Sequence, residues 1–386
     1  MSRYLDAASG LPLRPEARRA LDAALEHGWA DPARLHRDGR VARQLLDAAR
    51  ASLAGLVGAL PQEIHFTSSG AAAIQLGVLG TARGRRKVGT QVVASAVEHS
   101  AVLAAADWVA GDEPVLCPVN SQGQVEVKAM RRAVRADGVA LACLQHVNHE
   151  VGTIQPLAEV RAATSSAGVP LLVDACAALG SLPAPQDWDL LAGSAHKWGG
   201  PAGVGFLAVR SGVRWRSPWP TDSGGRQAGF PNIAGIVCAV TALEAAVAEL
   251  RATQTRRARL IATLRERVPQ LAPDIAVLGP AGDGAAPHIV CFTVLYADGE
   301  TLVRALDREG YAVSSGSACT SDVRRPSHVL AAMGAMTHGN LRVSLPPDAT
   351  EDDIAGFLAA LPAAISAARE AADRTTDAAD AASRAR

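Results

Sequence analysis

Short apolar segments alternate with segments of helical spacing as far as about residue 232, and this alternation restricts the fold more than any other feature. The apolar segments are rich in Val, Leu and Ala and are often apolar at consecutive positions. Strands show this pattern when both faces of a mostly parallel sheet are buried, so the alternation predicts an α/β protein. The expected strands are Glu63–Phe66, Gln91–Ala94, Pro114–Cys117, Val139–Leu144, Pro170–Val173 and Gly205–Val209. The expected helices are Ala71–Thr81, Ala101–Trp108, Val127–Ala136 and Leu157–Ser166.

The pattern changes after residue 232, where two long helical segments follow one another, Ile233–Glu249 and Thr255–Val268. Fewer strands come after them, in the order expected of a smaller α+β domain. We therefore expect a large domain over residues 14–248, and a small domain over residues 249–386 together with residues 1–13. The later expected elements are strands His288–Leu295, Ala312–Ser315 and Leu341–Leu345, and helices Glu300–Glu309 and Ala349–Ala371.

The charge balance narrows the choice of partners. The 386 residues include 38 Lys and Arg against 38 Asp and Glu, which argues against direct binding to nucleic acid or to a membrane surface.

No uninterrupted apolar run approaches the roughly 18 residues of a transmembrane helix. The first residues lack the charged-then-apolar layout of a signal peptide. We expect a cytoplasmic protein.

The spacing of the cysteines predicts neither a disulfide framework nor a zinc site. None of the six belongs to a CxxC pair, so neither structural zinc nor disulfides are expected, and most should be small buried side chains. His146 and His149 follow Cys143 at intervals of three, but on an extended segment the two histidines point to opposite faces. No metal site is expected there. The cysteines are Cys117, Cys143, Cys176, Cys238, Cys291 and Cys319.

Lysine is rare, and only three residues could act as an amine nucleophile. Lys87 lies in a basic run and Lys128 among arginines, which indicates a solvated surface for both. Lys197 instead follows an apolar strand, in SAHKWGG, where a lysine is costly unless it is paired or chemically used. A structural role and a Schiff-base role for Lys197 are equally compatible with this local context.

Other polar residues also follow expected strands. Asp174 ends the strand of VPLLVDACAALG, where it is either a helix cap or a partner for a cofactor cation. The turn in HFTSSGAAAIQLG would present the backbone N–H groups of residues 68–71 to a phosphate at a helix start. His99, taken alone, is more typical of a structural histidine. Ligands bind where parallel strands end at one sheet edge, so Asp174 and Lys197 are candidates for one site.

Cys319 differs from the other cysteines because it lies in a polar Gly/Ser segment, VSSGSACTSD. An accessible thiol of this kind is a candidate nucleophile. The alternative is a surface thiol without a role.

Together these motifs resemble those of the cysteine desulfurases of the NifS/IscS type, which belong to the class V aminotransferase superfamily. The resemblance runs from YLDAAS through FTSSGA, VEHSAVL, VNHEVGTIQP, VDA and SAHKWGGPAGVG to SSGSACTS and LRVSLP. It implies the fold of the fold-type I enzymes of pyridoxal 5'-phosphate (PLP). That fold has a mostly parallel central sheet flanked by helices and a smaller α+β C-terminal domain. The resemblance also implies a homodimer.

The resemblance assigns the cofactor contacts residue by residue. Lys197 would bind PLP covalently, Asp174 would pair with the ring nitrogen, and His99 would stack on the ring and move protons. The phosphate would be held by two segments that are distant in sequence, through Ser69, Gly70, Ala71, Ser194 and His196.

The resemblance also implies the reaction. Asn148 would contact the ring oxygen or the substrate carboxylate, Arg342 would clamp that carboxylate, and Cys319 would attack the substrate sulfur. L-cysteine would become L-alanine, and Cys319 would carry a persulfide to an acceptor protein. The acceptor stays open among iron–sulfur scaffolds, tRNA thiolation, DNA phosphorothioation and natural-product pathways.

The sequence departs from the family pattern where side chains usually contact the cofactor. Ala71, Ala177 and Phe230 stand where hydrogen-bonding residues are usual, and we expect weaker cofactor binding. Two other functions remain open: a selenocysteine lyase or specialised C–S lyase of the same fold, and a non-catalytic paralogue that acts as a partner subunit. The complete SGSACTS segment favours the desulfurase, because simple β-elimination needs no loop thiol.

Overall fold

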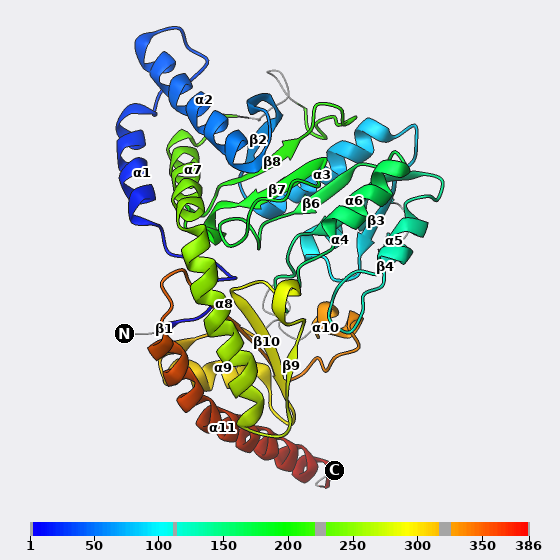
Figure 1. Cartoon of the computed structure of the whole chain (residues 1–386), viewed down its shortest axis with the longest axis vertical. Helices are drawn as coiled ribbons and strands as arrows, with labels where there is room; N and C mark the ends of the chain where they lie inside the picture. Colours follow the sequence, from blue (N-terminus) through cyan, green and yellow to red (C-terminus); the bar gives the residue numbers. More distant parts are fainter. Residues whose placement is uncertain (1–2, 111–113, 221–228, 316–325, 385–386) are drawn as a thin grey trace.

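The computed structural model describes residues 3–110, 114–220, 229–315 and 326–384. Its larger part is a seven-stranded sheet between two layers of helices (Figure 1). The strand order is β2-β8-β7-β6-β5-β3-β4, and β8 is the strand that runs antiparallel to its neighbours. The strands are β2 (Ile64–Thr67), β3 (Gln91–Ser95), β4 (Val115–Cys117), β5 (Val139–Gln145), β6 (Leu171–Asp174), β7 (Leu190–Ser194) and β8 (Gly205–Val209). The expected mostly parallel sheet is confirmed.

Helices cover both faces of this sheet, which explains why its strands are apolar at consecutive positions. In β5, Leu141 and Cys143 pack against α3 and α4, while Ala142 and Leu144 pack on the opposite face, in the cluster that includes α2 and α7. Both sets are fully buried. The helices of this part are α1 (Pro15–His27), α2 (Arg37–Val57), α3 (Gly70–Arg85), α4 (Ser100–Ala110), α5 (Val127–Ala133), α6 (Leu157–Ser166) and α7 (Ile233–Ala248).

A smaller α+β part lies below the sheet in Figure 1 and has its own apolar core. Its three-stranded antiparallel sheet has the order β12-β10-β9. The N-terminal strand β1 pairs in parallel with β11, so the start of the chain belongs to this part. The elements are β1 (Arg3–Tyr4), α8 (Leu250–Arg267), β9 (Ile275–Leu278), β10 (Ile289–Val294), α9 (Gly299–Arg308), β11 (Tyr311–Ala312), α10 (His328–Ala332), β12 (Asn340–Ser344) and α11 (Glu351–Arg384).

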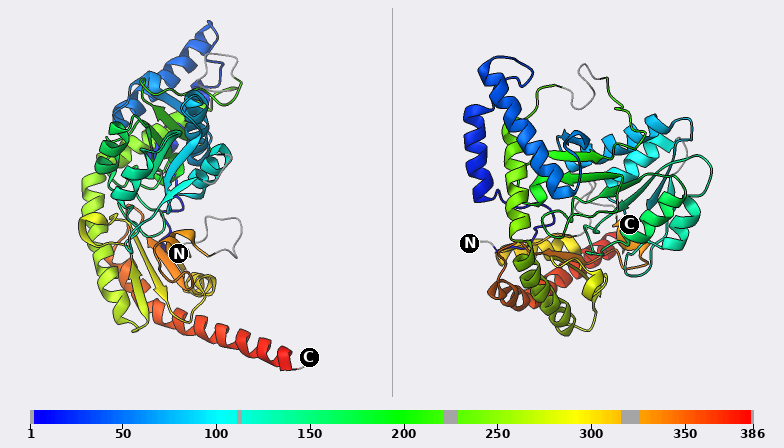
Figure 2. Two further views of the ribbon diagram at one scale, coloured as in Figure 1. Left: turned by 90° about the vertical axis from the view of Figure 1, so that its right-hand side faces the viewer. Right: turned by 45° about the horizontal axis from the view of Figure 1, so that its top comes forward.

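One long helix, α8, connects the large part to the small part, and another, α11, completes the small part. The chain bends by 68° between α7 and the segment that begins with α8. The backbone of α11 extends beyond the body of the molecule (Figure 2). Its first part, Glu351–Ala371, is long and apolar enough to cross a membrane by length and composition. Phe357 and Leu361 on that helix are fully buried in the small core, which is the ordinary place of an amphipathic core helix.

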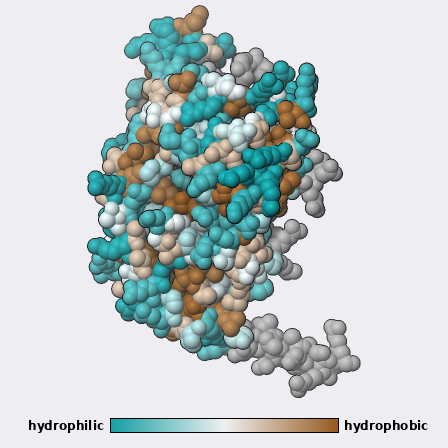
Figure 3. Space-filling model, turned by 45° about the vertical axis from the view of Figure 1, so that its right-hand side comes forward, coloured by the Kyte–Doolittle hydropathy of each residue, from teal (hydrophilic) through white to brown (hydrophobic). Residues whose placement is uncertain are grey.

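The sequence analysis did not find every element. It named neither α1 nor α2, whose buried residues include several alanines that give a weak apolar pattern, and it missed β9 and the short α10. The five described cysteines are buried, as expected for most of the six. On the face in Figure 3, apolar residues form separate patches among hydrophilic ones.

Candidate active site

A cavity of about 360 Å³ lies at the edge of the large sheet where the parallel strands end. Residues that are distant in sequence line it together. A larger groove, of about 560 Å³, lies between α8 and α11, but its lining includes no lysine, histidine or cysteine. The smaller cavity is therefore the candidate site by its chemistry. Its lining includes Ser69, Gly70, Ala71, His99, His149, Asp174, Cys176, Ala177, Ser194, His196 and Lys197.

Lys197 is the lysine that the structure places at this cavity. It ends a short 3₁₀ turn that directly follows β7, so the strand end fixes its position. Lys87 and Lys128 are exposed on the surface, as the sequence predicts. A partly buried amine in a cavity has the chemistry of a Schiff-base lysine.

Asp174 ends β6, next to β7 in the sheet, and is 7% exposed. Its Oδ1 accepts a hydrogen bond of 2.9 Å from the backbone N–H of Cys176, so the carboxylate is held in one orientation. The thiol of Cys176 also lines the cavity, a place that the sequence analysis did not predict. Burial first, and the Asp174 carboxylate second, raise the pKa of that thiol well above its usual range. The thiol therefore stays protonated.

His99 faces the same cavity from the turn between β3 and α4. Its Nδ1 accepts from the backbone N–H of Ala101 at 3.1 Å, which leaves Nε2 as the protonated ring nitrogen of the neutral form. Burial lowers the pKa of His99, and the charge of Lys197 lowers it further, while Asp174 acts in the opposite direction. A neutral imidazole beside the lysine can accept or donate a proton.

The turn before α3 and the end of β7 form one polar corner. Ser69 caps α3 by accepting from the Ala72 N–H at 3.0 Å, and the Gly70 N–H donates to Ser194 Oγ at 3.3 Å. Ser194 Oγ in turn lies 3.0 Å from His196 Nδ1. A Cβ on Gly70 would meet Cys176 Sγ at 2.6 Å, so the turn is packed too closely for any other residue. The N-terminus of a sixteen-residue helix with serine and histidine beside it suits an anion.

Asn148 and Arg342 do not line the cavity. Asn148 is fully buried, and its Oδ1 accepts from the N–H groups of Glu150 and Val151 while its Nδ2 donates to the Val97 carbonyl. This corrects the expectation that its side chain is available to the cofactor or substrate: it holds the turn after β5. The guanidinium of Arg342 donates to Asp6 Oδ1 and Ser9 Oγ, both at 2.8 Å. Ser9 lines the cavity, so Arg342 lies behind its wall.

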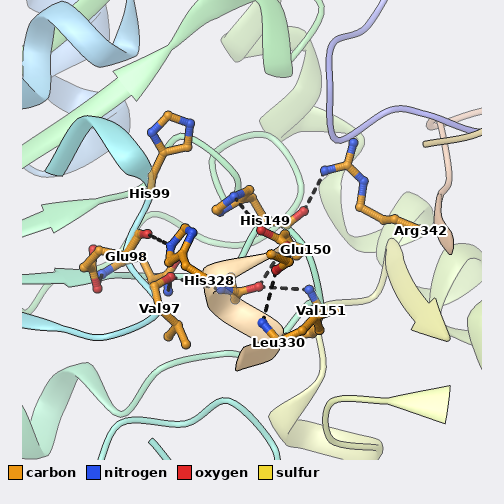
Figure 4. Close-up of polar contacts among 12 residues, drawn as sticks. Val97, Glu98, His99, His149, Glu150, Val151, His328, Leu330 and Arg342 are labelled. Carbon is orange, nitrogen blue, oxygen red and sulfur yellow. Dashed lines mark hydrogen bonds and ion pairs between the residues drawn. The ribbon is translucent and has the colours of Figure 1, made fainter. Parts of the chain in front are cut away.

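His149 also lines the cavity, whereas Asn148 beside it in the sequence does not. Figure 4 shows His149 between His99 and Arg342. Its ring lies edge-on to that of His99, with centroids 5.1 Å apart, and its carbonyl accepts from Arg342 Nη1 at 2.9 Å. Burial, then the neighbouring His99, lower the pKa of His149 well below its usual range. The sequence analysis noticed this histidine only in a metal context. Asn148 and His149 lie in a turn after the strand, where the alternation of side chains along a strand no longer predicts which of two adjacent residues faces a cavity.

The four remaining predicted positions have different outcomes. Cys319 lies outside the described residues. Ala71 and Ala177 line the cavity, as expected for positions near the cofactor, and Phe230 is 60% exposed. No group of three or more metal-ligating side chains occurs in the part of the chain that the structure describes.

Comparison with known proteins identifies the family of this chain. The class-V aminotransferase family matches residues 3–357. This chain belongs to that family. Among family members, it is 37% identical to a cysteine desulfurase of Cereibacter sphaeroides, over 93% of this chain and 94% of the relative. It is 35% identical to an IscS-like cysteine desulfurase of Mycobacterium tuberculosis, over 96% of this chain and 98% of the relative.

Solved structures of other proteins have the same fold. A NifS-like protein superposes with a TM-score of 0.87 at 27% identity, over 95% of this chain and all of that one. The apo cysteine desulfurase of Thermococcus onnurineus NA1 reaches a TM-score of 0.83 at 21% identity, which shows the shared fold. The fold-type I architecture is confirmed.

The family depends on PLP, and the walls of this cavity fit that cofactor. The helix start at Ser69–Ala71, with Ser194 and His196, would hold its phosphate. Asp174 would face its ring nitrogen, and the amine of Lys197 is the group that can bind its aldehyde carbon. His99 and His149 line the same cavity. The donor set thus contains a partner for the phosphate, the ring nitrogen and the aldehyde.

Proposed function

We propose that this chain is a PLP-dependent cysteine desulfurase, a sulfurtransferase that converts L-cysteine to L-alanine and transfers the sulfur to Cys319. The observation that carries the proposal is the meeting of Lys197, Asp174 and His99 in one cavity at a sheet edge. Relatives that are more than 30% identical over nearly the whole chain are named cysteine desulfurases. The meeting of these three reactive groups in one cavity speaks against a non-catalytic partner subunit.

The residues of this chain have distinct tasks in the reaction. When bound, PLP supplies a protonated ring that withdraws electrons from the substrate's α-carbon. Lys197 removes the α-proton, Asp174 keeps the ring nitrogen protonated, and His99 moves protons beside them. Neutral His99 carries its proton on Nε2, because Nδ1 accepts from the Ala101 N–H, so it can donate that proton and take one back.

The sulfur transfer balances without an added oxidant. The Cys319 thiolate attacks the substrate sulfur, so an S–S bond forms and the bond from Cβ to sulfur breaks. The electron pair of that bond stays with carbon, which takes a proton and leaves as L-alanine. Cys319 keeps the persulfide until a protein thiol accepts the outer sulfur.

We propose further that the enzyme is a cytoplasmic homodimer that delivers sulfur to an acceptor protein, with iron–sulfur cluster assembly as one destination. The names of the IscS relatives support this destination. The even balance of 38 cationic and 38 anionic residues is compatible with a protein acceptor and no direct contact with nucleic acid or membrane.

Borohydride reduction of the purified holoenzyme tests the site. We expect a mass shift of bound cofactor on the peptide with Lys197, and L-alanine formation from L-cysteine before reduction only. A Lys197→Ala variant should lose roughly 10²–10⁴-fold in turnover, because it removes both the cofactor bond and the base. A mass shift on Lys87 or Lys128 would contradict the assignment, and an unchanged rate in Cys319→Ala without added thiol would contradict the role of Cys319.

A further inference from the structure

The short helix α10 follows Cys319 in the sequence, yet it packs on the large part of the molecule. Val329, Leu330 and Met333 belong to the large apolar core and not to the core of the small domain. The start of α10 therefore lies against the wall of the cavity, beside the turns that carry His99 and His149 (Figure 4).

Ser327 makes the main polar contact of this helix start. Its hydroxyl donates to Glu150 Oε2 at 2.6 Å and accepts from the Leu330 N–H at 3.1 Å, so one oxygen caps α10 and fastens it to the turn after β5. Ser327 is 4% exposed and Glu150 3%. Burial raises the pKa of Glu150 to about 7, while the bond from Ser327 favours the charged form. A hydroxyl bound to a buried carboxylate is a strong, directional contact.

Three more contacts hold the same region. His328 Nε2 lies 2.8 Å from the carbonyl of Glu98, the residue before His99. At the other end of the segment that contains Cys319, the Arg342 N–H donates to the Ser314 carbonyl at 2.7 Å. Arg342 also binds the carbonyl of His149. The described chain on both sides of Cys319 is thus attached to the cavity wall.

We propose that Ser327 and Glu150 are positioning residues for the transfer of sulfur to Cys319, because their hydrogen bond fixes the start of α10 to that wall. This inference rests on the proposed role of Cys319. Ser327 is the second described residue after the segment that contains Cys319, so the anchor fixes the point at which that segment rejoins the cavity wall. We expect the effective concentration of the thiol at the cavity to fall when this point is released.

The test uses the full-length holoenzyme in a single turnover with L-cysteine. One readout is the spectral change on substrate binding, and the other is the rate at which the Cys319 peptide gains the mass of one sulfur. Ser327→Ala should slow the second rate about tenfold and leave the first within twofold. Ser327→Thr keeps the hydroxyl and should restore the rate. Thr350→Ala removes the exposed side-chain cap at the start of α11 and should change neither readout.

A second variant distinguishes the hydrogen bond between Ser327 and Glu150 from the capping of α10 by Ser327. Glu150→Gln replaces the charged acceptor by a neutral amide oxygen and leaves the cap of α10 in place, so it should slow sulfur transfer as Ser327→Ala does but by a smaller factor. The double variant should be no slower than the slower single variant by more than twofold, because both changes act on one contact. Hydrogen exchange at residues 328–333 should be faster in each. If Ser327→Ala does not fold, Glu150→Gln gives the same two readouts.

The outcomes distinguish the two proposals. A wild-type enzyme that places no sulfur on Cys319 overturns the proposed function. A wild-type enzyme that does so, with an unchanged rate in Ser327→Ala and Glu150→Gln, overturns the positioning role alone. Equal losses in substrate binding and in sulfur transfer would also overturn it, since they would indicate general damage to the cavity.

Discussion

Two groups of residues that line the cavity are held in different ways, and we call them the cofactor side and the histidine side. The cofactor side consists of Ser69–Ala71, Asp174 and Ser194–Lys197, and each segment lies at or just after the end of a strand of the large sheet. The histidine side consists of His99 and His149, whose sequence neighbours Glu98 and Glu150 do not line the cavity. Strand ends fix the first side, whereas turns held by buried polar contacts fix the second.

This difference makes the histidine side sensitive to protonation. Glu98 is fully buried, its Oε1 accepts from the Gln145 N–H, and its Oε2 has no hydrogen-bond partner among the described residues. Burial raises the pKa of Glu98 to about 8, and Asp174 adds to the rise. On the cofactor side, by contrast, Asp174 and Ser194 are held by hydrogen bonds from backbone N–H groups.

The pH dependence of stability should come largely from the histidine side. Below pH 4.5 Glu98 is protonated in the folded and the unfolded chain alike, but between pH 4.5 and about pH 8 only the folded chain keeps the proton. The free energy of unfolding should therefore fall as pH rises through this window, by about 1.4 kcal/mol per pH unit from this group. Glu98→Gln keeps an acceptor and cannot ionise, so its decline should be smaller.

Urea denaturation of both proteins at several pH values measures this difference. The exposed Glu159→Gln is the matched control and should follow the wild type. Equal pH slopes for Glu98→Gln and the wild type would show that Glu98 titrates in the folded protein as it does in water.

The cofactor side should instead be sensitive to volume. Gly70→Ala places a Cβ 2.6 Å from Cys176 Sγ and 2.8 Å from Ser194 Cβ, and we expect a loss of about 1–3 kcal/mol in stability together with weaker cofactor binding. Gly55→Ala, in α2 with nothing within 4 Å of its Cβ, should gain about 0.5–1 kcal/mol. Chemical denaturation compares the two, and equal effects would refute the packing argument.

Cofactor affinity should be improvable at the start of α3. Ala71 lines the cavity, and a hydroxyl there could donate to the phosphate, so Ala71→Thr should tighten PLP binding about tenfold. Ala72→Thr adds the same side chain one position later, outside the cavity lining, and is the matched control. Equilibrium titration of PLP into apoprotein gives both constants. An unchanged constant for Ala71→Thr in a folded protein would mean that other groups already saturate the phosphate.

The smallest effect is expected from the histidine pair. His149→Ala removes the edge-to-face contact with His99, worth about 0.5–1.5 kcal/mol, and should weaken PLP binding by at most about tenfold. It should also shift the pH titration of the bound cofactor's absorbance, because a cavity wall is lost. His146→Ala, on the same segment but outside the cavity lining, should not shift that titration. Identical titrations for the two variants would show that His149 is only a packing residue.

The residues that the sequence assigned to the cofactor side lie at one cavity, and they could be named from the sequence because they are local features. A lysine, an aspartate and a small-residue turn after apolar strands identify strand ends, and parallel strands bring their ends to one edge. It did not predict Cys176 or His149 at the cavity. It also assigned Asn148 to the ligand, although the structure uses that side chain to hold a turn.

The sequence by itself determined the strand–helix alternation, the parallel sheet and the single lysine at a strand end, because each depends on residues that are near one another in the chain. The tertiary structure decided which residues complete the cavity. Ser327 lies 177 positions from Glu150, and His328 lies 230 positions from Glu98. Periodicity carries no information about such distant contacts. Burial then raised the pKa values of Glu98 and Glu150, since a carboxyl group responds to the solvent that the whole fold excludes.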